Sequence, residues 1–598
     1  MRPVLLFDGK CAFCRRWVER WRARTGDAVI YRRSRRARRA VQLIDSDGKR
    51  YEGAEAVFRA LSRAPRLRLV AAIGRWPVVR WFAARTYRFI AAHRTLAARV
   101  DRMLFGRSTA APSRRVVRWL FLRCLGGVYL IAFTSLRVQV LGLYGSRGIE
   151  PIGKLLAALR AGAGRDAYRI APTLLWLGSS DRDLVRLCGA GQLCAVAMML
   201  DVAPRAMAAA LWALYLSFVS VGRDFLSFQW DALLLETGVH AMLVGPSSSD
   251  RDRPGEPRWL GALLMRWLVF RLHFQSGLVK LQSRDATWRR CTACAYHYQT
   301  QPLPTRVGWY ASHLPRPFQK LSTAATLAIE LAAPPLVFAP RRVRKAAFAA
   351  LTGLQLLIAA TGNYAFFNLL TIMLGLWVLD DSSFGQLGRV AGVRVGRRRT
   401  TSRWLRVALH VGHAAIAAVV AIVSAATFTR RVGQRPLVRP LARAAARLTA
   451  LVEPIRSINP YGLFAVMTTE RPEIVVEGSD DGKTWREYHF RHKPSRPEDP
   501  PRWVAPHQPR LDWQMWFAAL GAPPDWFAAF LARLLQGSPD VLALLATNPF
   551  PAHPPRYIRA LLYDYQMTDR PTRARTGAWW HRRLLRTYFP PSMSPHPG

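Results

Sequence analysis

Two C-x-x-C pairs, Cys11/Cys14 and Cys291/Cys294, are the residues whose type and spacing point most directly to chemistry. A thiol at a helix N-terminus can be activated, because the positive end of the helix stabilises the thiolate and lowers the thiol pKa. Cys11 and Cys14 follow a predicted buried strand, Val4–Phe7, and open an amphipathic helix that we expect to end near Arg24. This is the strand–loop–helix context of thiol–disulfide redox chemistry. Cys291 and Cys294 form a second candidate redox pair.

A group of ionisable residues lies inside an apolar stretch. Asp231, Glu236 and His240 fall within residues 229–246, a segment of membrane length. Charge at membrane depth is costly and tends to be functional or paired, so these side chains are candidates for a site. Alternatively, the segment packs at the membrane interface, and Asp231 and Arg223 are satisfied locally.

Lys280 is a third candidate, because it lies near the end of an apolar helix in a chain that strongly prefers arginine. Only eight of the 88 basic residues are lysine. Its ammonium could snorkel to the membrane interface while the stem lies along the helix. Alternatively, a partly dry pocket could lower its pKa and make it a base or proton donor.

Polar and aromatic side chains are dense between residues 503 and 514. They form either a surface that binds another protein or a satisfied polar core under a predicted hairpin at 472–491. No catalytic triad, phosphate loop or zinc spacing is legible in the C-terminal part, and we predict no metal and no cofactor. The residues of this segment are Trp503, His507, Gln508, Arg510, Asp512, Trp513 and Gln514.

Three regions must position these residues, so the predicted fold is multi-domain. Residues 1–105 read as a small α/β head, with strands at 4–7 and 28–32, a hairpin around Asp47–Gly48, and helices near 53–63 and 66–100. Residues 118–428 read as a polytopic helical membrane core, and 455–570 as a soluble α+β domain with a sheet or sandwich. A loose Pro-rich tail is expected at 587–598. We count about nine membrane segments, at 118–136, 184–200, 204–222, 229–246, 259–281, 321–339, 346–361, 364–379 and 404–428.

The charge balance fits a membrane protein better than a nucleic-acid-binding one. The formal charge is +51, but the arginines are spread among apolar runs and no zinc-finger, RNP or helix-turn-helix pattern is present. Basic stretches at 341–345 and 386–406 fit cytoplasmic loops by the positive-inside rule. The first eight residues are too short for a signal peptide, so we expect a cytoplasmic head and, with nine spans, an extracytoplasmic C-terminal domain.

The head resembles the DCC family of thioredoxin-like proteins, named for an Asp-x-x-Cys-x-x-Cys element. Here that element consists of Asp8, Cys11 and Cys14. The resemblance implies a thiol–disulfide oxidoreductase in which Cys11 attacks and Cys14 resolves. The alternative is a head that keeps the cysteines without turnover.

Most of the remaining chain resembles the lipase maturation factors. Five strings carry this resemblance: RDFLSFQWDALLLETG (223–238), YHYQTQPLPT (296–305), TGNYAFFNLLTIMLGLWVLDD (361–381), NPYGLFAVMTTERPEIVVEGSDDGKTW (459–485) and WVAPHQPRLDWQMWFAAL (503–520). Family members are endoplasmic-reticulum membrane proteins that help secreted homodimeric lipases to fold and assemble. The resemblance therefore implies a membrane protein that matures exported clients, among them a lipase. The Arg/Ala-rich composition and the fused head look bacterial, which places the chain in the bacterial cytoplasmic membrane, or in the endoplasmic reticulum if it is eukaryotic.

A shorter string, FRLHFQSGLVKLQSRDATW (270–288), looks like the HTTM superfamily, which includes the vitamin K-dependent γ-carboxylase. That resemblance implies a catalytic role for Lys280, with His273 one to two helical turns before it. Two alternatives to the maturation function therefore stand. One is a transmembrane electron-transfer enzyme that links the two thiol pairs, and the other is an intramembrane carboxylase-type enzyme that uses Lys280.

Overall fold

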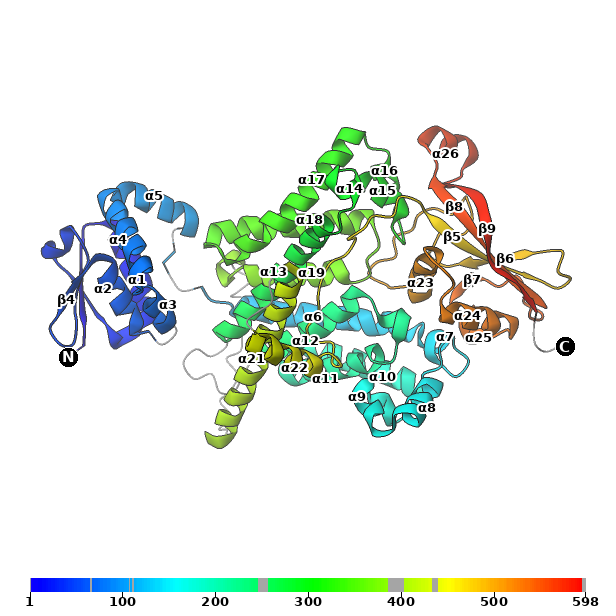
Figure 1. The fold of residues 1–598 in the computed structure, drawn as a ribbon, viewed down its shortest axis with the longest axis horizontal. Helices are drawn as coiled ribbons and strands as arrows, with labels where there is room; N and C mark the ends of the chain where they lie inside the picture. Colours follow the sequence, from blue (N-terminus) through cyan, green and yellow to red (C-terminus); the bar gives the residue numbers. More distant parts are fainter. Residues whose placement is uncertain are drawn as a thin grey trace. The chain divides into compact units, whose positions relative to one another are not determined.

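The computed structural model describes residues 2–64, 67–106, 108–109, 112–245, 256–385, 403–432 and 439–593. The chain divides into two compact units (Figure 1). The first consists of Met1–Ser113 with two short pieces, Phe338–Ala346 and Asp380–Ser383. The second holds the other residues, including the C-terminal domain.

The head is a small α/β fold around a four-stranded sheet with the order β2-β1-β3-β4. Strands β1 and β2 are parallel and α1 connects them, whereas β3 pairs antiparallel with both β1 and β4. The predicted strands and hairpin are therefore present. The elements are β1 (Val4–Phe7), α1 (Ala12–Thr25), β2 (Ile30–Arg33), β3 (Gln42–Ile44), β4 (Arg50–Glu52), α2 (Gly53–Ser62), α3 (Arg68–Ile73), α4 (Pro77–Ala92) and α5 (Arg94–Phe105).

The single helix expected at 66–100 is wrong, because the chain forms three helices there. Pro77 is the first residue of α4, where its missing N–H costs nothing, so a new helix begins at that point. At His93 the backbone leaves the helical region, with φ −115° and ψ 47°, and α5 starts at the next residue.

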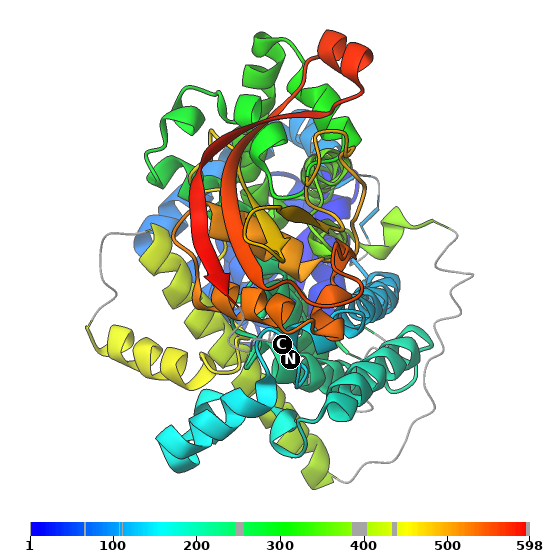
Figure 2. The same ribbon diagram turned by 90° about the vertical axis from the view of Figure 1, so that its right-hand side faces the viewer.

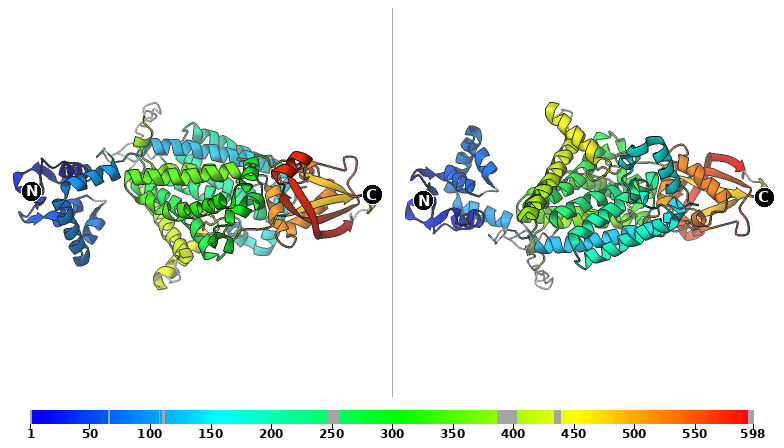
Figure 3. Two further views of the ribbon diagram at one scale, coloured as in Figure 1. Left: turned by 90° about the horizontal axis from the view of Figure 1, so that it is seen from above. Right: turned by 90° about the horizontal axis from the view of Figure 1, so that it is seen from below.

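The second unit begins with the helical core. Long helices such as α6 and α10 pack side by side (Figure 3). The core helices are α6 (Arg115–Arg137), α7 (Val140–Tyr144), α8 (Ile152–Ala163), α9 (Ala167–Ile170), α10 (Asp181–Met199), α11 (Pro204–Val219), α12 (Gln229–Val244), α13 (Trp259–Gln282), α14 (Ala286–Arg289), α15 (Ala293–Thr300), α16 (Arg306–Ser312), α17 (Arg316–Ala332), α18 (Arg341–Thr361), α19 (Phe367–Gly375), α21 (Arg403–Val432) and α22 (Arg439–Val452).

Each of the nine predicted membrane segments coincides with a helix, but fewer of these helices qualify as spans. Among the described residues, three are long and apolar enough to cross a membrane: Arg115–Arg137, Arg316–Phe338 and Arg341–Thr361. The other six are shorter or more polar, because several carry the ionisable residues that the sequence singled out. The number of spans thus stays a prediction.

The C-terminal domain is built on a five-stranded sheet with the order β7-β6-β5-β8-β9, in which all neighbours are antiparallel. Strands β8 and β9 are long and curve together (Figure 2). One hydrophobic core continues from the membrane helices into this domain. The elements are β5 (Pro472–Ser479), β6 (Arg486–Phe490), α23 (Arg510–Ala519), α24 (Asp525–Leu535), α25 (Pro539–Leu542), β7 (Leu545–Thr547), β8 (Tyr557–Met567), α26 (Arg570–Thr576) and β9 (Trp580–Met593).

The end of the chain differs from the expectation. Residues 587–593 were expected in a loose tail, but they form the last part of β9, and residues 594–598 lie outside the described part. Pro590 and Pro591 suggested a coil, yet β9 is an edge strand, where a residue without an N–H is tolerated. The sheet therefore extends beyond residue 570.

Candidate functional site

The first ion pair of the site joins the membrane core to the C-terminal domain. Asp231 on α12 accepts two hydrogen bonds from the guanidinium of Arg510 on α23, at 2.9 and 3.0 Å. Tyr215 on α11 donates its hydroxyl to the same carboxylate, and Arg510 also donates to the carbonyl of Phe225 at 2.5 Å. The Asp231 side chain is fully buried, and both of its oxygens are bonded. In the alternative interpretation, Asp231 and Arg223 are satisfied locally, but Arg223 pairs with Glu150 at 3.2 Å and Asp231 with the distant Arg510.

The second ion pair lies about one and a half helical turns further along α12. Glu236 pairs with Arg271 of α13, and both side chains have zero exposure. The other carboxylate oxygen accepts the hydroxyl of Tyr461 at 2.5 Å and the backbone N–H of Asn459 at 2.9 Å. Asn459 and Tyr461 lie in the segment that leads into the C-terminal sheet. Helix α12 therefore bonds to the C-terminal region at two places, at this segment and at α23. His240, one turn on, donates to the carbonyl of Glu236 at 2.8 Å.

The polar segment at 503–514 packs into the core and many of its polar atoms are bonded, but the amide nitrogen of Gln508, the Nε of Arg510 and the indole N–H of Trp513 have no hydrogen-bond partner among the described residues. His507 shares a hydrogen bond of 2.9 Å with Ser135 on α6. The side-chain oxygen of Gln508 accepts the indole N–H of Trp230 at 2.6 Å, and Trp513 packs against Trp230 with ring centroids 4.8 Å apart. Burial lowers the pKa of His507 to about 4, so the ring is neutral at physiological pH.

Asp512 belongs to the same core. One oxygen of its carboxyl accepts the backbone N–H groups of His492 and Lys493, each at 2.9 Å, just after β6. Burial raises the pKa of Asp512 to about 6. Of the seven residues that the sequence singled out here, Trp503 is the exposed exception at 61%.

Lys280 is buried rather than snorkelling, with 4% exposure. Its ammonium donates to both carboxylate oxygens of Glu330 on α17, at 2.8 and 3.0 Å, and to the carbonyl of Ser276 at 3.1 Å. It also lies 5.2 Å from the centroid of the Trp288 ring. The lysine therefore connects α13 to α17 through a buried ion pair.

The head brings Asp8, Cys11 and Cys14 together at the start of α1. Cys11 is the N-cap residue, and its sulfur accepts the backbone N–H of Cys14 at 3.3 Å. Burial, reinforced by the hydrogen bond with Cys11, raises the pKa of Cys14 to about 12. Asp8 pairs with Arg94 of α5 at 3.0 Å and accepts the N–H of Lys10 at 2.9 Å. The pair thus combines one thiol at the open helix end with one thiol held protonated behind it.

The second C-x-x-C has a different setting. Cys291 lies before α15 in a left-handed conformation with φ 54°, and Cys294 lies inside that helix. The side chain of Cys294 is buried, and burial raises its thiol pKa above the ordinary value. Its backbone N–H donates to the hydroxyl of Thr323 at 3.0 Å. All seven cysteines are free thiols, and within the described ranges no three metal-binding side chains cluster.

Sequence reasoning missed the partners of the buried acids. Three pairings were not predicted: Glu236 with Arg271, Glu236 with Tyr461, and Asp231 with Arg510. The two partners in these pairings lie 35 to 279 residues apart in the chain. A partial signal existed, since each buried acid requires a cation. The many arginines spread among the apolar runs leave the choice of partner open.

Taken together, the structure shows a sheet domain bonded into a helical core that holds three candidate membrane spans, and an α/β head that carries a thiol pair. Three family models match the chain: the lipase maturation factor transmembrane domain over residues 116–386, the lipase maturation factor C-terminal domain over 457–590, and a DCC1-like thiol-disulfide oxidoreductase over 5–100. No solved structure matches the chain.

Full-length relatives agree with the family models. Lipase maturation factor 2 of Homo sapiens is 37% identical over 586 residues, which covers 80% of this chain and 82% of the relative. The Mus musculus protein of the same name is also 37% identical, and lipase maturation factor 1 of Bos taurus is 32% identical over 509 residues, covering 80% of this chain and 89% of the relative. This chain belongs to the lipase maturation factor family. Both resemblances read from the sequence, to that family and to the DCC family, are confirmed.

Proposed function

We propose that this protein assists the folding of exported clients at the membrane surface, and that a secreted lipase is the client to test first. The family supports a membrane maturation factor. The observation that carries the proposal is the Asp231–Arg510 pair, which bonds the C-terminal domain to α12 at two hydrogen bonds of 2.9 and 3.0 Å. A domain fixed in this way presents its sheet at a constant distance from the membrane, where a client emerges.

Co-expression with a secreted homodimeric lipase tests this proposal. We expect the lipase activity per milligram of secreted enzyme to rise when this protein is present, with unchanged lipase transcript. Crosslinking from the C-terminal domain should recover the lipase. An equal specific activity with and without this protein would contradict the proposal, and a crosslinked partner other than a lipase would replace the client.

The proposed topology has nine spans, with the head in the cytoplasm and the C-terminal domain outside a bacterial cytoplasmic membrane. Its support is the basic stretch at 341–345 at the start of α18, which fits a cytoplasmic end. Reporter tags at residue 345 should face the cytoplasm, and tags after residue 460 should face outside. Reports from the same side for both tags would make the number of spans between them even.

A second function, thiol–disulfide exchange by the head, is favoured by the position of Cys11. A sulfur that caps a helix and accepts an amide N–H is placed to carry negative charge. In the exchange, the Cys11 thiolate attacks a substrate disulfide, forms a mixed disulfide and releases one substrate thiolate. Cys14 then attacks the Cys11 sulfur, which forms the Cys11–Cys14 disulfide and releases the second substrate thiol. Equilibration of the full chain with mixtures of reduced and oxidised glutathione, followed by alkylation and mass measurement, should give a Cys11–Cys14 disulfide as oxidised glutathione is reduced, and this species should be absent in Cys11→Ser.

The electron-transfer and carboxylase-type alternatives stay predictions that no contact favours. A relay through Cys294 would need a thiol that a substrate disulfide can reach, and the side chain of Cys294 is buried. A base at Lys280 would need a neutral amine that a substrate can reach, and here both oxygens of Glu330 bind the buried nitrogen.

A further inference from the structure

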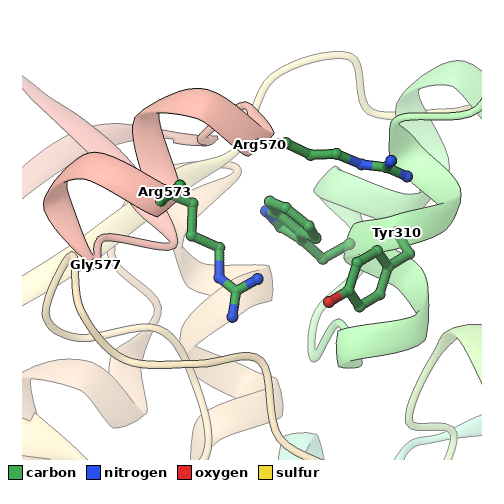
Figure 4. Close-up of a pocket in the computed structure, with 6 residues that line it drawn as sticks. Tyr310, Arg570, Arg573 and Gly577 are labelled. Carbon is green, nitrogen blue, oxygen red and sulfur yellow. The ribbon is translucent and has the colours of Figure 1, made fainter.

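A cleft of about 470 Å³ lies between α16 and α26 in the second unit. Arg570 and Arg573 reach from α26 toward the helix that carries Tyr310 (Figure 4). The cleft is lined by Trp309, Tyr310, Arg570, Arg573, Ala574 and Gly577. None of these residues belongs to the buried ion pairs or to the thiol sites.

The arginines of the cleft are oriented by aromatic rings rather than by acids. The guanidinium of Arg573 lies 3.6 Å from the ring centroid of Trp579, and the guanidinium of Arg306 lies 5.9 Å from the same centroid. Arg570 lies 5.9 Å from the Tyr310 centroid. In the part of the chain that the structure describes, none of the three forms an ion pair with a carboxylate. The adjacent acid, Asp569, is bonded to the backbone N–H of Thr572 at 2.8 Å.

Trp309 adds a neutral donor to these cations. Its side chain is 1% exposed, and its indole N–H has no hydrogen-bond partner among the described residues. A buried indole N–H normally finds an acceptor, and the indole N–H groups of Trp17, Trp377 and Trp513 lack one as well. Two arginine side chains at one cleft suit a phosphate group, because arginine binds phosphate oxygens through two parallel hydrogen bonds.

The position of the cleft in the chain indicates where the phosphate comes from. Helix α16 ends at Ser312, and the candidate span Arg316–Phe338 begins four residues later. Phe318 and Leu321, in the first turns of that span, expose apolar side chains. The cleft therefore adjoins the end of a membrane segment, where tryptophan, tyrosine and arginine meet lipid headgroups.

We infer that this cleft binds the phosphate of an anionic phospholipid, with the acyl chains against the exposed face of α17. Arg570 and Arg573 hold the phosphate oxygens, Trp309 donates its N–H, and Tyr310 covers the headgroup. An acidic polypeptide segment would also satisfy the cations, but the cleft adjoins the end of a candidate membrane span, where phospholipid headgroups lie. The site is independent of the client-maturation function.

The test is native mass spectrometry of the full-length protein in a neutral detergent, titrated with phosphatidylglycerol and, separately, with phosphatidylcholine. We expect retained phosphatidylglycerol on the wild type, and about a hundredfold weaker retention for Arg570→Gln/Arg573→Gln, which loses two charge-assisted contacts at about tenfold each. The matched control is Arg583→Gln/Arg586→Gln, which removes two exposed arginines of β9 at the same net charge and should retain the lipid. Trp309→Phe, which keeps a ring but lacks the N–H, should weaken retention severalfold.

Two competition arms separate the sources of the anion. Inorganic phosphate should displace the lipid only at much higher concentration, because it lacks the acyl chains. Equal retention of both lipids, or equal losses in the cleft and control variants, would overturn the inference. Displacement by a poly-glutamate peptide at lower concentration than by the lipid itself would overturn it in favour of a peptide site. Unchanged thermal melting of each variant ensures that lost binding is not lost folding.

Discussion

The head and the membrane core use polar side chains in opposite ways. In the head, Cys11 and Asp8 are only partly buried, and the sulfur of Cys11 has an amide N–H as its recorded partner. In the core, Asp231 and Glu236 are fully buried, and each carboxylate has partners on both oxygens. Both regions carry motifs that sequence reasoning marked as functional, but the two carboxylates of the core are enclosed by their partners, whereas the thiol of Cys11 is only partly buried.

The difference teaches how to separate architecture from chemistry. A buried charge is retained at a cost in desolvation, and its partners recover that cost only when the geometry is complete. The core pairs meet this condition and tie elements together that are far apart in the sequence. A group that performs a reaction must still be reached by its substrate. We therefore expect core variants to change stability and head variants to change chemistry.

Arg510→Met should have the largest effect on stability. Removing one partner of a buried ion pair leaves an uncompensated charge and costs about 3–5 kcal/mol. The variant protein should melt at a lower temperature in detergent and yield less monodisperse material. Arg583→Met, an exposed arginine on β9, serves as the control and should behave as the wild type.

A double variant sharpens this prediction. Asp231→Leu combined with Arg510→Met removes both charges, and it should recover part of the stability that Arg510→Met alone loses. If the single variant melts like the wild type, the pair does not fasten the C-terminal domain, and the comparison between the two regions loses its main support.

Replacement of Lys280 should have the next largest effect on stability. Lys280→Ala leaves Glu330 buried without its cation, and we expect a loss of about 3 kcal/mol. Lys280→Arg keeps the charge, so it should keep both the stability and the lipase-maturation activity. A Lys280→Arg protein that is stable but inactive would instead indicate proton transfer by the lysine, because a guanidinium stays protonated.

The sequence predicted local structure better than partnership. The strand before Cys11, the helix after it and the nine helical segments follow from periodicity and apolar length. The partner of Asp231 lies 279 residues away, and no local rule joins the two positions. The edge strand β9 was missed because its outward-facing arginines and two prolines hide the alternation. Local rules identify which residues need partners, whereas packing decides which partners they find.

Asp512→Asn should have a smaller, pH-dependent effect. Burial raises the pKa of Asp512 to about 6, so the folded protein favours the protonated form. Its contribution to the free energy of unfolding is fully present below the usual carboxyl pKa near 4. That contribution is lost as the pH rises through about 6, a change of ~1–3 kcal/mol. Both backbone N–H groups bind the same oxygen, so asparagine can accept both.

The measurement is the difference in melting temperature between wild type and Asp512→Asn from pH 4 to pH 7. The melting temperature of the variant should rise relative to that of the wild type as the pH increases from 4 to 7. Burial lowers the pKa values of His492 and His507 to about 4, so their contribution to stability rises with pH. This contribution is the same in both proteins and cancels in the difference of melting temperatures. A difference that does not change with pH would mean that Asp512 is ionised in the folded protein.

Cys14→Ser should have the smallest effect on stability and the clearest effect on chemistry. Serine is close in size to cysteine, and Cys14 lies on the first turn of a helix whose N-cap is Cys11, so the head should melt as before. Once Cys11 has attacked a substrate disulfide, no thiol remains to displace it, and the mixed disulfide should accumulate. Non-reducing electrophoresis after acid quenching should show this adduct for Cys14→Ser, and Cys11→Ser/Cys14→Ser should lack it. Cys294→Ser is the matched control in the other C-x-x-C pair, and it should trap nothing through Cys291. An adduct at Cys291 and none at Cys11 would reverse the comparison and make the second pair the reactive one.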